Sequence, residues 1–174
     1  ALIAGGKLIA GREIRRLGRK AYSAKADQLA FGAYNKPFAP NRTRFDWISV
    51  SETNVDAYIA DPLCGGDTTL GLFRDMLGGL GIITKQANIE RMDKDLPVLF
   101  IAGDQDPVGE MGKGVRRAYQ AFRKAGVGDV SIKLYHGLRH EILNEASRRY
   151  VYQDVLDWLE TRAERADKAS SSVS

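Results

Sequence analysis

A short apolar run that ends in an acidic turn constrains the fold of this chain more than any other feature. Val98–Ala102 is continuously apolar and is bounded by Pro97 and Gly103. Such a run is typical of a strand that is buried on both faces, as in a parallel sheet covered by helices. A second strand pattern follows one helix later and leads into a loop with two histidines. The order predicts an open α/β sheet whose polar residues gather where the strands end.

The elements that follow this run are predicted from their periodicity. Helical spacing over residues 113–125 ends before Gly126, and residues 130–135 alternate apolar and polar side chains, as in a strand with one wetter face. A long amphipathic helix is expected over residues 147–163. The remaining residues, 164–174, are expected to form a frayed tail.

The section before the run reads as mostly helical. Its expected elements are one or two amphipathic helices over 1–20 weakened by glycines, a short helix capped by Ser49 or Ser51 and stopped at Asp61-Pro62, a helix over 68–80 ended by Gly78-Gly79, and a more polar helix over 84–95. The chain therefore divides into a helical section (1–95), a strand–helix–strand–helix section (96–163) and the tail (164–174). Two strands expose unpaired edges and make a weak parallel sheet, so we expect further strands before Ala1.

The composition is that of one globular domain. Hydrophobic residues make up 44% and charged residues 28% of the 174 residues. A single cysteine, Cys64, leaves no internal disulfide and favours a reducing compartment, which predicts a cytoplasmic location. Neither a transmembrane stretch nor a signal peptide is evident, and a chain that opens with Ala inside an apolar run is easily read as a fragment or a processed product.

Positive charge is concentrated in the first quarter of the chain. Residues 1–44 contain ten Lys and Arg but only Glu13 and Asp27 as acids. This section could make peripheral contact with an anionic membrane, and a solvated helix face is the blander alternative. No nucleic-acid partner is expected, because the sequence has neither an RNA-binding signature of aromatics and glycines nor zinc-finger spacing.

Two acids and two histidines are candidates for a catalytic pair. A carboxylate just past a strand end can fix the tautomer of a histidine and stabilise the imidazolium that forms. Asp106, in the turn before Pro107, suits this role better than Asp104, which lies closer to the strand and could cap the turn. His140 lies farther into its loop than His136 and is the better placed general base.

Three stretches carry a family resemblance: Phe100–Gly109, Tyr135–Glu145 and Val151–Leu159. They resemble the C-terminal part of α/β-hydrolases of the monoacylglycerol lipase and lysophospholipase-like group, also classed with the serine aminopeptidase S33 domain. Residues 45–65 resemble the cap of the bacterial members. The match extends from about Gln28 to Leu159. It implies an α/β fold, with part of an α/β-hydrolase core and a mostly helical cap.

The resemblance also implies roles for individual residues. Asp106 would be the triad acid and His140 the triad base, whereas His136 has no transferred role. No Gly-x-Ser-x-Gly occurs in the sequence, so the serine is expected upstream of Ala1. The cap section would line an acyl-chain pocket with the aromatics Phe31, Tyr34, Phe38, Phe45 and Trp47. No metal or organic cofactor is expected.

The resulting hypothesis is a serine hydrolase that cleaves carboxylic esters, such as monoacylglycerol or lysophospholipid. The chain by itself is expected to be inactive, because a His–Asp pair without a nucleophile keeps little rate enhancement. Two alternatives stay open: a non-catalytic or degenerate half that associates with another chain, and an enzyme of the same fold with an aspartate nucleophile. The sequence leaves the acyl chain, the head group and the oligomeric state undetermined.

Overall fold

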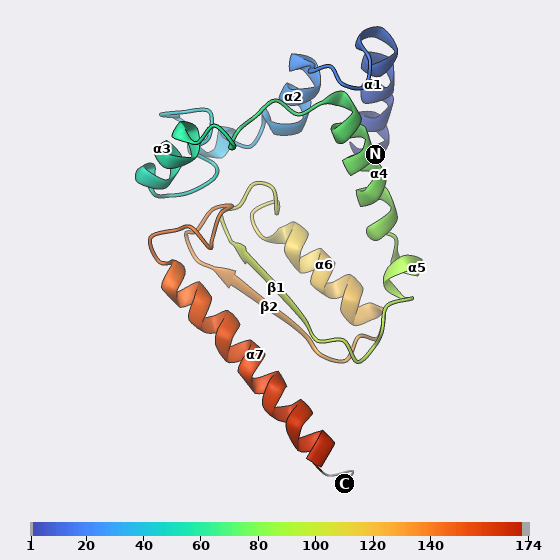
Figure 1. The fold of residues 1–174 in the computed structure, drawn as a ribbon, viewed down its shortest axis with the longest axis vertical. Coiled ribbons are helices and arrows are strands. Elements are labelled where there is room, and N and C mark those ends of the chain that lie inside the picture. The colour runs from blue at the N-terminus through green and yellow to red at the C-terminus, as the bar shows by residue number, and fades with distance from the viewer. Residues whose placement is uncertain (1, 172–174) are drawn as a thin grey trace.

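The computed structural model describes residues 2–171, and Figure 1 shows the order of the elements. The helical section contains α1 (Leu2–Leu17), α2 (Ala24–Phe31), a 3₁₀ helix η1 (Lys36–Phe38), α3 (Glu52–Ala60), α4 (Leu70–Ile83) and α5 (Gln86–Ile89). The section that follows contains β1 (Val98–Gly103), α6 (Lys113–Lys124), β2 (Val130–Tyr135) and α7 (Arg148–Ser171).

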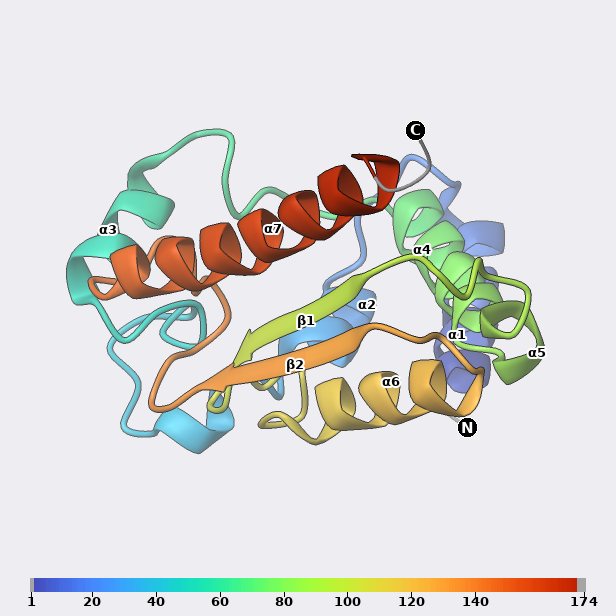
Figure 2. The same ribbon diagram turned by 90° about the horizontal axis from the view of Figure 1, so that it is seen from below.

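The two strands pair in parallel, as predicted, in a register that runs from Val98 opposite Val130 to Gly103 opposite Tyr135. Helices α6 and α7 cover opposite faces of this pair, as Figure 2 shows. The first turns of α7 contribute the buried Val151, which packs with Tyr135 and Ile142. Because the strands end at the same level, the loops after them leave the sheet side by side.

Helices α1 and α4 lie against each other and form the core of the cap section (Figure 1). The buried residues are Ala10, Ala26, Leu70, Phe73 and Leu77. Helix α1 is a single helix despite its glycines. At Gly6 a Cβ would come within 2.8 Å of Leu77 Cδ1, so this glycine allows α4 to pack closely.

Ser51, one of the two predicted caps, begins α3. Its Oγ accepts a hydrogen bond from the Asn54 amide at 3.4 Å. The predicted end at Asp61 is also confirmed, since Asp61 is the C-terminal cap of α3. Ser49 has a different role, described below.

Three predicted helix ends were wrong. Helix α4 continues through Gly78-Gly79 to Ile83, because packing on α1 outweighs the cost of about 1 kcal/mol for each glycine in a helix. Helix α5 is much shorter than 84–95, and an Asx turn follows it in which the Asp95 amide donates to Asp93 Oδ1 at 3.0 Å.

Helix α7 extends beyond residue 163 to Ser171, where a frayed tail was expected. Residues 164–171 contain no Gly or Pro to end a helix and include several good helix formers. Residues 172–174 lie outside the described part of the chain. Over residues 2–171 no helix combines the length and apolar character needed to cross a membrane.

Candidate active site

Asp106 is held in the turn that follows β1. Its amide donates to the Gly103 carbonyl at 3.3 Å, and its own carbonyl accepts from the Met111 amide at 2.8 Å. The carboxylate Oδ1 also accepts a hydrogen bond from the Val108 amide at 2.8 Å. With only 6% of the residue exposed, the carboxylate is buried and its orientation is fixed by backbone contacts.

His140 lies in the loop between β2 and α7, residues 136–147, which we call the His140 loop. The loop crosses directly over Gly103, where a Cβ would overlap the carbonyl oxygens of Leu138 and Arg139. The Gln105 amide donates to the Leu138 oxygen at 3.0 Å. Glycine at the end of β1 therefore lets the loop approach the acidic turn.

Asp106 and His140 meet where these two segments converge. His140 Nδ1 lies 3.2 Å from both carboxylate oxygens of Asp106. The hydrogen bond to Asp106 raises the pKa of His140, against an opposing effect of burial. Because 39% of the side chain is exposed, the imidazole can be reached while its Nδ1 side is held. The geometry is that of a histidine base oriented by a carboxylate.

A second acid–histidine pair lies beside the first and was not foreseen from the sequence. His136 Nδ1 is 2.9 Å from Asp104 Oδ2, and the Gly137 amide donates to Asp104 Oδ1 at 2.8 Å. These contacts lower the pKa of Asp104, chiefly through His136. The His136 side chain is 96% exposed. This pair therefore fastens the start of the His140 loop at the surface, and Asp104 does more than cap its own turn.

The cap brings aromatic rings to His140. Trp47 packs on the imidazole with ring centroids 5.2 Å apart, and Tyr34 lies 5.1 Å from Trp47. Phe31 continues the row at 6.1 Å from Tyr34. The Trp47 amide donates to Asn35 Oδ1 at 2.9 Å, which anchors the tryptophan backbone. Three of the five predicted aromatics thus form a row that ends at the histidine.

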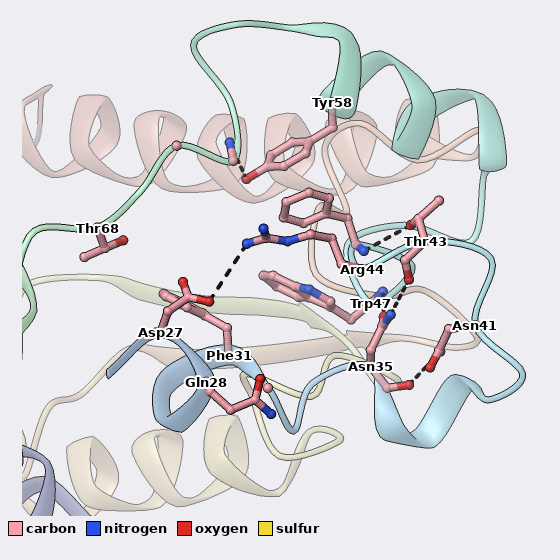
Figure 3. A pocket seen from close by; sticks show the side chains of 14 residues that line it. Asp27, Gln28, Phe31, Asn35, Asn41, Thr43, Arg44, Trp47, Tyr58 and Thr68 are labelled. Atoms are coloured by element: carbon pink, nitrogen blue, oxygen red, sulfur yellow. Dashed lines mark hydrogen bonds and ion pairs between the residues drawn. The ribbon is translucent and has the colours of Figure 1, made fainter. Parts of the chain in front are cut away.

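A cavity of about 590 Å³ lies in the cap beside this row. Figure 3 shows the side chains that line it. Phe31, Phe45 and Trp47 line it together with Tyr58, and Arg44 reaches toward Asp27 at 4.0 Å. The further lining residues are mainly polar or small: Gln28, Gly32, Asn35, Asn41, Thr43, Gly65, Gly66 and Thr68. The cavity therefore combines aromatic walls with hydrogen-bonding groups.

The other two predicted aromatics lie elsewhere. Tyr34, with Phe31, borders a second cavity of about 500 Å³ between α1, α2 and α4, whose lining is largely apolar. Phe38 lies under the Arg139 guanidinium, with its ring centroid 4.0 Å from Cζ of Arg139. The five residues therefore divide between two cavities and the His140 loop and do not form a single pocket.

A buried network, also missed from the sequence, joins the cap to the His140 loop. Glu145 has no exposed surface, and its Oε2 accepts from Ser49 Oγ at 2.6 Å. Arg139, beside His140, donates to the carbonyls of Asp46 and Ser49. The sequence signal for this network is weak, because an acid and an arginine in a polar loop are usually exposed.

The family assignment follows from comparison with known sequences. Residues 5–147 match the family described as serine aminopeptidase, S33. The chain belongs to the serine aminopeptidase S33 family. The resemblance seen in the sequence is thereby confirmed. A monoacylglycerol lipase of Mycolicibacterium smegmatis is 31% identical to this S33 chain over 119 residues, covering 66% of the chain and 38% of the lipase.

Solved structures show the fold of the S33 chain. It is similar to a thermostable carboxyl esterase from Bacillus coagulans, with a TM-score of 0.83 and 24% identity over 91% of the chain and 52% of the esterase. A lipase in its open form gives a TM-score of 0.77 with 22% identity, covering 90% of the chain and 50% of the lipase. The chain thus has part of an α/β-hydrolase fold and spans about half or less of these relatives' length.

Proposed function

We propose that this S33 chain supplies the acid and the base of a serine hydrolase that cleaves carboxylic esters. The observation that supports this most directly is the bond between the buried Asp106 carboxylate and Nδ1 of the accessible His140. A carboxylate in this position keeps the proton on Nδ1, which leaves Nε2 free to act as a base. Family membership supports the same chemistry.

In the proposed mechanism, Nε2 of His140 takes the proton of a serine hydroxyl as the oxygen attacks the ester carbonyl. Asp106 stabilises the imidazolium that forms. His140 then returns the proton to the leaving alcohol, and a water molecule repeats the cycle on the acyl-enzyme. The 174 residues contain no Gly-x-Ser-x-Gly, so we propose that the serine comes from residues outside this sequence and that the chain alone is inactive.

We further propose a lipid-like ester, monoacylglycerol or lysophospholipid, as the substrate. The apolar cavity between α1, α2 and α4 suits an acyl chain, and the cavity beside Trp47 offers both aromatic walls and polar partners for a head group. Phe31 borders both cavities, which fits a substrate with one apolar and one polar end. A contact between Phe38 and the substrate stays a prediction.

The cap surface supports a further proposal, peripheral binding to an anionic membrane. Lys7, Arg15 and Arg74 line a groove between α1 and α4 that also contains the exposed Leu8, and Arg19 in the same groove is paired with Asp75 at 2.7 Å. Basic groups beside exposed apolar side chains are typical of interfacial helices. Vesicles with anionic lipid should bind the protein more tightly than neutral vesicles, and equal binding to both would end this proposal.

A fluorophosphonate probe on the protein extended by its upstream coding sequence tests the catalytic proposal. We expect rapid labelling of the extended protein, slow labelling of its His140→Ala and Asp106→Asn variants, and none of residues 1–174 alone. Labelling of His140→Ala at the wild-type rate would exclude His140 as the base. If the upstream sequence encodes no serine elbow, the non-catalytic alternative takes its place.

A further inference from the structure

The 46–50 segment of the cap forms hydrogen bonds with Arg139, Glu141 and Glu145 of the His140 loop, and we call this set of bonds the junction. The Arg139 guanidinium donates to the carbonyls of Asp46 and Ser49, the latter at 3.1 Å. The Glu141 amide donates to the Ile48 carbonyl at 2.9 Å. These bonds flank His140 on both sides along the chain.

Glu145 contributes a buried carboxylate to the junction. Its Oε2 accepts from Ser49 Oγ at 2.6 Å, and its Oε1 accepts from the Val50 amide at 3.0 Å and from the Arg139 amide at 3.4 Å. One carboxylate thus holds two cap residues and one residue of the His140 loop. A buried carboxylate needs such donors, since an unpaired one is costly.

Trp47 connects this junction to the catalytic pair. It lies within the 46–50 segment, and its ring packs 5.2 Å from the His140 ring. A shift of the segment would therefore move Trp47 relative to the imidazole. The same shift would disturb the Arg139 backbone, which directly precedes His140.

We propose that Glu145 is a positioning residue that locks the 46–50 segment onto the His140 loop and so fixes the orientation of His140 toward Asp106. Its importance for catalysis rests on the proposed function, in which His140 is the base. The junction itself does not depend on that function. The cap position and the orientation of the base are then set together.

The experiment uses variants that break the junction in two ways. Glu145→Gln keeps the shape but removes the charge and replaces one acceptor oxygen with a donor group. Ser49→Ala removes the bond to Glu145, together with the bonds that Ser49 Oγ accepts from the Ser51 amide at 3.1 Å and from Asn54 Nδ2 at 3.4 Å, and leaves all charges in place. Glu13→Gln is the matched control, because Glu13 is a buried glutamate that accepts from Ser23 Oγ at 3.0 Å and lies in α1, away from His140.

The readout is the titration of His140 by NMR, which needs no nucleophile. The chain has only two histidines, and a His136→Gln background leaves one signal. Asp106 and Glu141 are the acids that act on His140, and both stay in every variant. We expect Glu145→Gln and Ser49→Ala each to weaken proton binding by His140 about threefold or more, which corresponds to about half a pKa unit. Glu13→Gln should leave the titration unchanged.

Trp47 fluorescence gives a second readout. In a Trp158→Phe background, the emission of Trp47 should follow protonation of the adjacent imidazole, and its midpoint should move with the NMR pKa in both junction variants. A purely structural residue would lower the melting temperature without moving either midpoint.

Two results would overturn the proposal. If neither junction variant changes the titration, Glu145 does not position His140. If only Glu145→Gln changes it, the effect is that of the lost charge. Should Glu145→Gln fail to fold, Ser49→Ala decides alone. Absence of hydrolysis would count against the proposed function and leave these titrations interpretable.

Discussion

Both carboxylate oxygens of Asp106 lie 3.2 Å from Nδ1 of His140, although 34 positions separate the two residues in the sequence. The parallel register brings them together, since Gly103 at the end of β1 pairs with Tyr135 at the end of β2. Each following loop then starts at the same edge of the sheet. The contact between Asp106 and His140 therefore depends on a single strand pairing.

The two acids after β1 should differ sharply in their effect on ester hydrolysis. Asp106→Asn removes the charge that stabilises the imidazolium, and we expect kcat/KM of the extended protein to fall about 10³–10⁴-fold. Asp104→Asn affects the surface contacts of Asp104 with His136 and the Gly137 amide, and should cost less than about tenfold. Steady-state hydrolysis of a short-chain ester measures both, and equal losses would contradict the assignment of Asp106.

The raised pKa of His140 makes folding stability depend on pH. Its extra stabilisation is complete below the ordinary histidine pKa of about 6.5 and is lost as the pH rises through the higher folded value. His140→Gln should therefore lower the free energy of unfolding more at about pH 5.5 than at about pH 8.5. Urea titrations of both proteins at both pH values measure this. A cost independent of pH would show that the bond to Asp106 does not shift the proton equilibrium.

Gly103 should tolerate no side chain. A Cβ there would overlap the carbonyl oxygens of Leu138 and Arg139, so we expect Gly103→Ala to destabilise the protein by about 3 kcal/mol and to weaken the contact between Asp106 and His140. Gly5→Ala is the control, because no atom other than those of its chain neighbours and its own helix backbone lies within 4 Å of its Cβ position in α1. It should stabilise the protein by about 0.5–1 kcal/mol. Urea denaturation measures both changes in the free energy of unfolding. If Gly103→Ala left this free energy unchanged, the His140 loop would be able to move away from the added methyl group.

The cavity of about 590 Å³ beside Trp47 should affect substrate binding, measured by KM, more than the rate of the chemical step, measured by kcat. Phe45 packs on Tyr58 with centroids 5.1 Å apart and forms part of the wall. Truncation by Phe45→Ala should raise KM for a monoacylglycerol about tenfold, from the loss of about 1.4 kcal/mol of apolar contact, with a much smaller change in kcat. Tyr150→Ala, at an exposed position on α7, should leave both constants unchanged. An unchanged KM in Phe45→Ala would show that the cavity is not part of the substrate-binding site.

Local sequence patterns were sufficient to predict the features that depend on neighbouring residues, namely the two strands and the side chains just past their ends. The run Val98–Ala102 and the alternation over 130–135 predicted the two strands, but not their burial. Val98–Ile101 are half-buried where burial on both faces was expected, and Tyr135, expected on the wetter face, is buried. The choice of Asp106 and His140 over their neighbours came from distance past a strand end, and the structure places these two in hydrogen-bonding contact.

Features that depend on distant partners could not be predicted in this way. Ser49 and Glu145 are 96 positions apart, and nothing in either local sequence indicates that they meet in a buried site. The pairing of Asp104 with His136 follows from the strand register, which the sequence alone leaves undetermined. Helix α4 runs through its glycines because tertiary packing on α1 overrides local propensity.

The pairing of Gly103 with Tyr135 also determines where the chain can tolerate insertions and deletions. A residue added within β2 would reverse the faces of the strand residues that follow it, up to Tyr135, and withdraw His140 from Asp106. A residue added after Gly126, beyond α6 at the opposite end of the sheet, would lengthen a connection outside both strands, while Gly126 itself keeps its positive φ of 84°. Length variation among natural homologues should therefore concentrate at that end and be rare between Val130 and His140.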